Sequence, residues 1–485
     1  MKERLLAHSV VYGGATILAR ATLVVMLLVL PFILTPREYG ALSMISAIAA
    51  LVGLVLPMEV SQGLARHYPQ APPAERPAYA GSAWWFTAGM MALFVVVAEA
   101  AARPLNMWIL GDPAYLGVYR VAVLSVALSV FFYFLQNQFR WEFRTREYVV
   151  LSLVFSFLTL ALSLGLGAVA QAPLLGVVSG QVMGGAAAVL LGMWRLRASL
   201  LTRPDVGKLR EMLEFSIPLV PASLAVFASN YASRLILNGL ESLQSVGIFT
   251  FASQIAGIGT LAVLGVQAAL VPLIMAHHHE PETPGTIGRS FEIFTVLALT
   301  LCLGLGLFSP EAIHYLGNPA YAGAAPLVLL LAPAVVGMQM YIFAPGFAVA
   351  KKTTWQMAVS VTAAAAGVAA NYALIALFGV TGAAIATLLT AGLFLGLWFG
   401  LSQRLYPLPI SWLKLALLAA AAGAAGGVGL WIRYPNLLVA LAVKAALVLA
   451  VLAVGIAGGL LPRHAILATL RALPIRPRPG PVPEP

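Results

Sequence analysis

The chain has 485 residues, of which 61% are hydrophobic and 9% are charged, and its net charge is +11. Soluble domains carry about 25% charged residues, so this composition excludes a set of soluble domains. The single cysteine, Cys302, excludes a disulfide framework and a cysteine metal cluster. The composition therefore predicts an all-α polytopic membrane protein.

Apolar runs long enough to cross a membrane follow one another along the chain. Each crossing needs about 20 mostly apolar residues. The first run is longer than the apolar region of a signal peptide, so we interpret it as a retained span. Fourteen spans are predicted, at residues 9–34, 41–65, 79–101, 117–137, 149–170, 173–194, 214–238, 245–275, 289–309, 322–344, 355–377, 380–401, 412–432 and 436–461. Two of the boundaries depend on turn residues, Pro173 and Gly379, inside runs too long for one crossing.

Basic residues alternate between the two sides of this span map. Of the 28 Lys and Arg residues, 21 fall in every second connecting segment, counted from the N-terminus. Cytoplasmic loops hold the excess of Lys and Arg, so both termini are predicted to be cytoplasmic. Topology thus explains the basic charge, and no nucleic-acid partner is expected. Residues 463–485 are predicted to form a Pro-rich, disordered cytoplasmic tail.

An internal repeat relates the two halves of the chain. "LGDPAY" begins at Leu110 and "LGNPAY" begins 206 residues later, at Leu316. Other pairs in this register are Gly176 with Gly382, Arg146 with Lys352 and, after a one-residue insertion, Gly40 with Gly247. Each half holds six spans, which predicts two parallel lobes, as in transporters that rock around a midplane site. The predicted parts are an N-lobe (1–200), a C-lobe (201–405) and two additional helices (406–462).

Three stretches carry a family resemblance. They are "TPREYGALSMISAIAALV", "FSIPLVPASLAVFASNYASRLIL" with "SVGIFTFASQI", and "AVAKKTTWQMAVSV" with "NYALIALFGVTGAAIATLL". Together they resemble the Wzx-type polysaccharide-exporter family of the multidrug/oligosaccharidyl-lipid/polysaccharide (MOP) superfamily, over about residues 1–405. The chain departs from that family at Ser233, where many members carry Asp before the Arg. This departure puts cation coupling through that carboxylate in doubt.

The resemblance implies a V-shaped pair of lobes and a function in cell-surface polysaccharide assembly, such as O-antigen. The implied function is a flippase of the bacterial plasma (inner) membrane, not an enzyme. It would move an undecaprenyl-diphosphate oligosaccharide to the outer leaflet by alternating access. A polysaccharide polymerase or glycosyltransferases of the pathway are the expected partners. The alternative is a cation-coupled multidrug exporter of the same superfamily. A membrane-embedded polymerase is disfavoured because the loops are short.

The sequence has no nucleotide-binding "GxxxxGK[ST]" loop. No cofactor is therefore expected, and a Na⁺ or H⁺ gradient is one open source of energy.

Charges inside spans need a reason, because one at the bilayer centre costs about 2.5–3.5 kcal/mol. Arg20 is either a cavity cation for a phosphate or the partner of Glu59 on the next span. Arg234 follows a polar segment, "SNYAS", which also holds Asn230. It is either a second cavity cation or a side chain that reaches the outer headgroups. Arg20, Glu59, Asn230 and Arg234 are therefore candidate substrate-binding residues.

Neutral polar residues inside spans are candidates for hydrogen bonds to sugars, and the alternative is that they join helices together. These candidates are Gln254, Gln267, Gln339 and Asn371, together with Gln136 and Asn137. A sodium site at Asn230, Asn371 and Thr387 is a weaker hypothesis, because no carboxylate is near. The segment "AHHHEP" is predicted to be a solvated loop and not a metal site.

Two further charges in predicted spans have structural interpretations. Lys444 is expected to pack against a lobe or to reach the interface. Glu292 is expected to begin its helix, where a negative charge is favourable.

Overall fold

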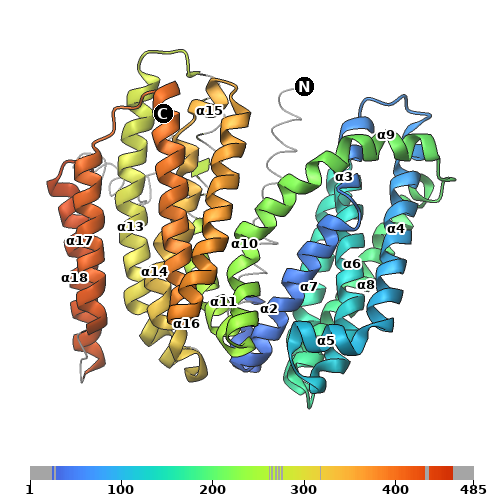
Figure 1. Ribbon diagram of the computed structural model, residues 1–485, viewed down its shortest axis with the longest axis horizontal. Helices are drawn as coiled ribbons and strands as arrows, with labels where there is room; N and C mark the ends of the chain where they lie inside the picture. Colours follow the sequence, from blue (N-terminus) through green and yellow to red (C-terminus); the bar gives the residue numbers. More distant parts are fainter. Residues whose placement is uncertain are drawn as a thin grey trace, which may run out of the picture. The chain divides into compact units, whose positions relative to one another are not determined.

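The computed structural model describes residues 25–26, 29–261, 263, 266–267, 270, 274, 277–316, 318–431 and 436–461. In this part of the chain every regular element is a helix (Figure 1), which confirms the all-α prediction. Eleven helices in it are long and apolar enough to cross a membrane. The chain divides into two compact units. Unit 1 comprises Met1–Gln254, Ala312–Ala324 and Ser360–Thr390, and unit 2 comprises Ile255–Glu311, Ala325–Val359 and Ala391–Pro485.

The eleven spanning helices contain twelve of the predicted spans, because α16 (Thr353–Leu405) holds two of them. Within α16 the backbone of Gly379 leaves the helical region, with φ +56° and ψ −136°. Gly382 then packs on the backbone of Leu374, so the chain turns back on itself. The turn predicted at Gly379 is confirmed. The span predicted at 9–34, and much of 245–275, lies outside the described residues, so the total of fourteen stays a prediction.

Unit 1 is built around a bundle of long helices that short ones connect. Its elements are α2 (Pro36–Val55), α3 (Val60–His67), α4 (Arg76–Ala100), α5 (Ala102–Leu110), η1 (Pro113–Tyr115), α6 (Leu116–Trp141), α7 (Thr145–Val169), α8 (Pro173–Leu200), α9 (Val206–Ser216), η2 (Ile217–Leu219), α10 (Val220–Leu240), the start of α11 (Leu243–Gly257), η3 (Pro319–Ala324) and the middle of α16. The predicted span at 41–65 is broken after Pro57. Met58 and Glu59 there adopt left-handed backbone conformations, with φ of 50° and 53°. Non-glycine residues seldom do so. The break separates α2 from α3.

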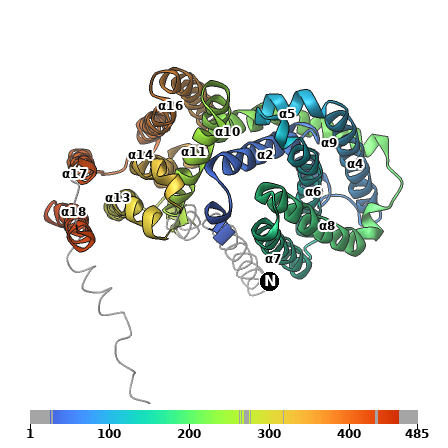
Figure 2. The ribbon, with the colours of Figure 1, turned by 90° about the horizontal axis from the view of Figure 1, so that it is seen from below.

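Helices α7 and α8 form a tight hairpin, and they lie beside α6 in Figures 1 and 2. Gly176, Gly180 and Gly184 recur at every fourth position of α8 and face the backbone of α7. Small residues at this spacing let two membrane helices approach closely. Helix α7 ends at Val169 and α8 begins at Pro173, which confirms the predicted boundary between these two spans.

Helices α2 and α11 cross at the two glycines that the repeat pairs. A methyl group on Gly40 would overlap the carbonyl oxygen of Leu243, and one on Gly247 would overlap that of Pro36. Pro36 and Leu243 hold equivalent positions in the repeat, so the contact is reciprocal. Such self-complementary contact is what a local two-fold relation between equivalent segments produces.

The last four residues of each repeated hexamer form the same turn. The side chain of Asp112 accepts a hydrogen bond from the amide of Ala114 at 2.9 Å, and that of Asn318 accepts one from the amide of Ala320 at 3.0 Å. Each turn leads into a 3-10 helix, η1 or η3. Asp and Asn favour this geometry because their side chains bond the backbone two residues ahead.

A second repeated turn corrects the register. Phe143 and Lys351 both have left-handed backbones, with φ of 57° and 56°. The next residues, Arg144 and Lys352, have nearly identical ψ values of 68° and 64°. Lys352 therefore matches Arg144, and its predicted match to Arg146 was wrong. The offset is not constant because the connection here differs in length.

Unit 2 contains most of the second half of the chain. Its helices are α13 (Thr283–Leu316) up to Glu311, α14 (Ala325–Met338), η4 (Gln339–Phe343), α15 (Gly346–Val349), the two ends of α16, α17 (Trp412–Trp431) and α18 (Leu437–Ala457). Three contacts tie the additional helices α17 and α18 to α13. The ammonium of Lys444 lies 2.6 and 2.7 Å from the two carboxylate oxygens of Glu311. Arg289 donates to the carbonyl of Gly459 at 2.9 Å, and Glu292 accepts from the amide of Ser411 at 2.9 Å.

These contacts show the surroundings of Lys444 and Glu292, the two charged residues with predicted structural roles. Lys444 is buried and pairs with another helix, which agrees with the predicted packing role. Glu292 is buried and lies inside α13, which begins at Thr283, so its predicted place at the start of its own helix was wrong. Its carboxylate instead accepts a hydrogen bond from the backbone amide of Ser411, the residue just before α17. The negative charge thus stabilises the N-terminus of that helix.

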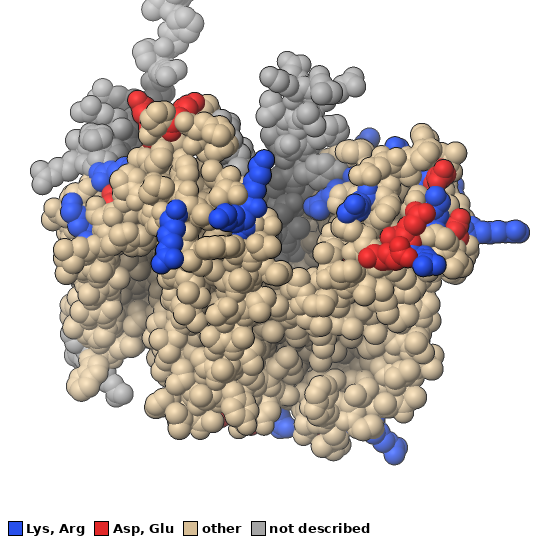
Figure 3. All heavy atoms as spheres, turned by 45° about the horizontal axis from the view of Figure 1, so that its top comes forward, with Lys and Arg blue, Asp and Glu red and all other residues tan. Residues whose placement is uncertain are grey.

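Basic residues gather at one end of unit 1, and the sides of its helices are nearly free of charge (Figure 3). Arg66 lies in the last turn of α3, Arg76 begins α4 and Arg140 lies in the last turn of α6. The opposite end holds Arg37, which forms an ion pair with Asp112 at 2.9 Å. The unit therefore has a charged end, an apolar middle and a less basic end, as a membrane protein requires. Which end is cytoplasmic stays a prediction.

Candidate functional site

A cavity of about 320 Å³ lies inside unit 1 among α2, α6, α7, α8, α10 and α11. It collects polar side chains from helices that are otherwise apolar. The polar lining residues are Tyr39, Ser43, Ser46, Ser125, Ser129, Thr159, Gln181, Arg234, Thr250 and Gln254. The lining among the described residues contains hydroxyls, amides and one guanidinium, but no carboxylate.

Arg234 is the charged residue of this lining. Its Nε atom is buried and has no hydrogen-bond partner among the residues that the structure describes, and its guanidinium carbon lies 5.2 Å from the ring centre of Tyr231. Within the described part of the chain, Arg234 forms no ion pair. A buried charge is normally paired or hydrogen-bonded. The cavity therefore presents a positive charge that the described lining does not neutralise.

Two further buried hydroxyls have no hydrogen-bond partner among the described residues. They are Oη of Tyr39 and Oγ1 of Thr159. The ring of Tyr39 is held edge-on by Phe251 and Tyr321, with centroid distances of 6.4 and 6.0 Å. Buried polar groups almost always have partners, so unpartnered ones around a cavity indicate a polar occupant.

Other polar groups of the lining are partly satisfied by one another. Ser43 of α2 and Thr250 of α11 share a hydrogen bond of 2.8 Å close to the glycine crossing. Ser125 of α6 donates to the side-chain oxygen of Gln181 of α8 at 3.4 Å. The amide nitrogens of Gln181 and Gln254 make no hydrogen bond within the described residues. They are available to a ligand as donors.

The structure brings two of the predicted site residues together, because Arg234 and Gln254 both line this cavity. Asn230 is on α10, one turn before Arg234, but it is exposed and donates to the carbonyl of Val226 at 2.9 Å. Glu59 precedes α3, away from the cavity lining. Arg20 lies outside the described residues.

The remaining predicted residues lie elsewhere. Asn371 is buried in α16 and donates to the carbonyl of Gly367 at 2.8 Å, which is a local helix contact. Gln267 is half-buried, and Gln339 begins η4; both belong to unit 2. These placements test no binding role, and the roles stay predictions.

The last of these assignments is the segment "AHHHEP", which was predicted to be a solvated loop and not a metal site. His277 pairs with Glu280 at 2.7 Å. No group of three potential metal ligands occurs among the residues that the structure describes.

Sequence reasoning missed several cavity residues, above all Gln181, Ser125, Ser129 and Tyr39. A usable signal was present for three of them. Gln181 is a lone amide inside an apolar span, and Ser125 and Ser129 recur four residues apart on one face of α6. Tyr39 carried no such signal, because aromatic residues are common near span ends.

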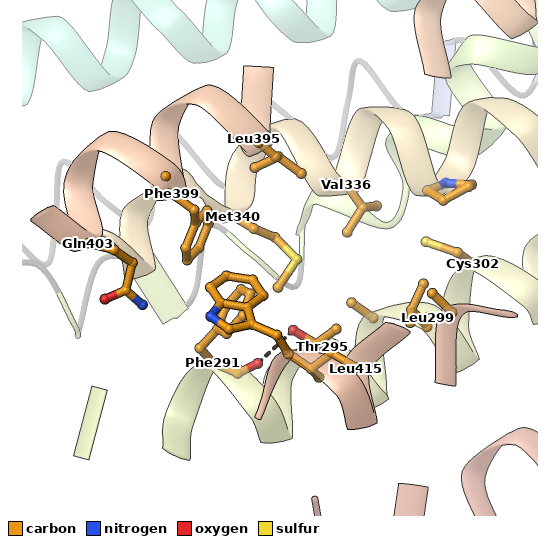
Figure 4. Close-up of a pocket in the computed structure, with 17 residues that line it drawn as sticks. Phe291, Thr295, Leu299, Cys302, Val336, Met340, Leu395, Phe399, Gln403 and Leu415 are labelled. Atoms are coloured by element: carbon orange, nitrogen blue, oxygen red, sulfur yellow. Dashed lines mark hydrogen bonds between the residues drawn. The ribbon is translucent and has the colours of Figure 1, made fainter. Parts of the chain in front are cut away.

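Unit 2 contains a larger cavity of about 610 Å³, among α13, α14, α16 and α17 (Figure 4). Its wall is almost entirely apolar, with Phe291, Met340 and Phe399 prominent in it. Two of its polar side chains already have partners. Thr295 donates to the carbonyl of Phe291 at 2.7 Å, and Gln403 bonds both backbone groups of Leu408. The smaller cavity of unit 1 is therefore the candidate polar site.

The cavity of unit 1 gathers polar side chains among helices that are long and apolar enough to cross a membrane, as in a polytopic membrane protein. Solved structures of membrane transporters share the fold. The lipid II flippase MurJ in an inward closed conformation superposes with a TM-score of 0.71, at 11% identity, over 91% of this chain and 98% of that one. An inward-facing MATE multidrug transporter of the MOP superfamily gives 0.60, at 14% identity, over 76% and 90%. A MATE protein in complex with MaD3S gives 0.53, at 14% identity, over 81% and 93%. At these identities the likeness shows the fold.

Residues 29–326, more than half of the chain, match the family described as "Polysaccharide biosynthesis protein", and the chain belongs to that family. This confirms the resemblance to a polysaccharide biosynthesis family, and the fold is the one that the MurJ and MATE structures share. A search of the curated proteins found no match to this sequence.

Proposed function

We propose that this protein flips an undecaprenyl-diphosphate oligosaccharide from the cytoplasmic to the outer leaflet. The observation that carries the proposal is the cation of Arg234, which has no ion-pair partner within the described residues and lies in a cavity whose described lining has no acid. Membership of a polysaccharide biosynthesis family supports a glycan cargo. The name of one similar structure, a lipid II flippase, supports movement of a lipid-linked substrate.

The chemistry of the lining suits the polar part of such a substrate. A guanidinium offers a planar fork of donors that binds two phosphate oxygens at once. Gln181 and Gln254 add amide donors and acceptors for sugar hydroxyls. In the predicted map, Arg20 adds a second cation to the same path. A diphosphate carries enough negative charge to engage more than one arginine.

A multidrug exporter is the second candidate, and the cavity disfavours it. An organic cation is bound most readily next to a carboxylate, whereas the described lining has only a cation and neutral groups. Ser233 also stands where many relatives have the acidic residue before this arginine. No coupling ion is assigned to the site.

Alternating access requires the cavity to open to one side at a time. In our proposal the crossing of α2 and α11 closes one side. Ser43 and Thr250 belong both to the cavity lining and to the hydrogen bond beside this crossing. In the predicted topology this end would lie at the outer face, because it is the less basic end. The predicted N-lobe (1–200) and C-lobe (201–405) would separate here to release the substrate outward.

The proposal includes a location and partners. The protein would lie in the bacterial plasma membrane with both termini in the cytoplasm. It would move its substrate without covalent change, so it would not be an enzyme. Glycosyltransferases would supply the lipid-linked oligosaccharide, and a polymerase would consume it on the outer side.

Reconstitution tests this function directly. The full chain is placed in proteoliposomes with a fluorescent undecaprenyl-diphosphate oligosaccharide, and the fraction reaching the other leaflet is measured by enzymatic or chemical access. We expect translocation that depends on the protein. The absence of translocation for several glycans, together with drug–cation exchange in the same vesicles, would establish the exporter instead.

A further inference from the structure

A third cavity lies at the basic end of unit 1, where α7 begins and α8 ends. Its volume is about 290 Å³. Arg146 and Val150 of α7 face Leu191 and Arg195 of α8 across it, and Phe139 of α6 lies in its wall. No step of the proposed transport uses these residues. The pocket is therefore a separate feature of the molecule.

The pocket is charged at its mouth and apolar one helical turn further in. Arg146 and Val150 are four residues apart on α7, and Leu191 and Arg195 are four apart on α8, so each pair lies on one helix face. Because α7 and α8 form a hairpin, the two arginines lie at the same end of both helices. One turn separates them from the apolar residues by about 5.4 Å along the helix axis.

The charge of the pocket is also distinctive. Neither the Arg146 nor the Arg195 guanidinium forms a hydrogen bond or an ion pair within the described residues. The acidic residue of the lining, Glu147, is already paired with Arg144 at 3.2 Å. Arg144 also donates to the carbonyl of Arg195 at 3.2 Å and so holds the end of α8 in place. Arg144 is also paired with Glu142 at 3.4 Å, so three arginines meet two carboxylates here and the pocket keeps a net positive charge.

We propose that this pocket binds the phosphate headgroup of an anionic phospholipid. The two guanidinium groups would hold the phosphate, and the acyl chains would lie along the exposed apolar faces of α7 and α8. Val150 is 43% exposed, Leu190 67% and Trp194 57%, which provides such a face. Basic pockets between membrane helices on the cytoplasmic side bind anionic headgroups in this manner.

Ordinary positive residues at a span end do not explain the arrangement. They need only lie in a cytoplasmic loop, and they need not converge from two helices. Here the guanidinium of Arg195 lies 4.9 Å from the ring centre of Trp194, a residue type that settles at the headgroup level. Arginine, aromatic ring and apolar floor together match the order of groups in a phospholipid.

Native mass spectrometry of the full chain in detergent tests the site. The protein is titrated with phosphatidylglycerol, with phosphatidylcholine of the same acyl chains, and with glycerol 3-phosphate. We expect phosphatidylglycerol to bind more tightly than the other two. Arg146→Gln with Arg195→Gln should weaken phosphatidylglycerol binding roughly 30-fold, and Arg195→Gln alone about fivefold, with the melting temperature unchanged.

The control is Arg66→Gln with Arg203→Gln, which removes the same number of charges from the same end of unit 1 but outside the pocket. It should retain most of the affinity. Equal losses in the two double variants would reduce the effect to net charge and overturn the site. Equal binding of the two lipids would also overturn it. Glycerol 3-phosphate binding as tightly as phosphatidylglycerol would assign the pocket to a free phosphate instead.

Discussion

Gly40 of α2 and Gly247 of α11 pack against each other, and each lies where a side chain would enter the backbone of the other helix. An added Cβ on either glycine would lie 3.0 Å from the amide nitrogen of the other, and nearer still to a carbonyl oxygen. The repeat pairs these two residues from the sequence alone. Their reciprocal contact shows that equivalent segments of the two repeats meet at this crossing, which lies beside the polar cavity.

We expect Gly40→Ala to lower the free energy of unfolding by about 1–3 kcal/mol, because the methyl group cannot fit against the carbonyl of Leu243. Gly89→Ala in α4 is the matched control, since a Cβ there has nothing within 4 Å. That change should leave stability equal or raise it by up to about 1 kcal/mol. Denaturant or thermal unfolding of the purified protein measures both. Similar behaviour of the two variants would contradict the close crossing.

A cross-link between α2 and α11 should stop transport. Ser43 and Thr250 already approach to 2.8 Å between their hydroxyl oxygens, so Ser43→Cys with Thr250→Cys should form a disulfide in a Cys302→Ala background. We expect oxidation to abolish translocation and a reductant to restore it. The two single-cysteine variants are the controls. Full transport by the cross-linked protein would show that this crossing does not open.

Replacement of Arg234, the cation of the cavity, should reduce transport without preventing folding. Arg234→Ala is expected to lower translocation about 10- to 100-fold, the loss of charged hydrogen bonds to a phosphate. Arg234→Lys should keep part of the activity, because lysine retains the charge but not the bidentate fork. Arg120→Ala is the control, as this arginine is exposed and pairs with Glu99 at 3.6 Å. Equal loss in that variant would remove Arg234 from the site.

Stability provides a second test of Arg234. Since its guanidinium has no ion-pair partner among the described residues, its removal should leave the melting temperature unchanged or higher. A large decrease would indicate a structural role, and the transport defect would then follow from misfolding.

The buried pair of Lys444 and Glu311 should behave as a structural unit. Their side chains are only 7% and 19% exposed. Lys444→Ala or Glu311→Ala leaves one charge buried without its partner, which costs about 3–5 kcal/mol. Lys444→Met with Glu311→Leu should recover most of that loss, because an apolar pair needs no desolvation of charge. Unfolding measurements decide this, and additive losses in the double variant would exclude the coupling.

Several elements follow from the sequence because they depend on neighbouring residues. The boundaries at Pro173 and Gly379 lie where proline or glycine stands inside an apolar run. The turn at Asp112 repeats at Asn318 because both side chains cap the same local backbone. Helix α9 was not predicted, because its amphipathic segment is short and its charged residues are typical of a loop.

The sequence by itself determined the membrane class, the helical fold, the internal repeat and the family resemblance. The first three rest on hydrophobicity, charge and spacing along the chain, and the fourth rests on stretches that resemble those of a known family. Only the tertiary structure decided that Arg234 and Gln181 line one cavity and that Lys444 pairs with Glu311, 133 residues away in the sequence. The reason is physical. Hydrophobic runs fix which segments become helices, whereas the packing of side chains between helices fixes which polar groups meet.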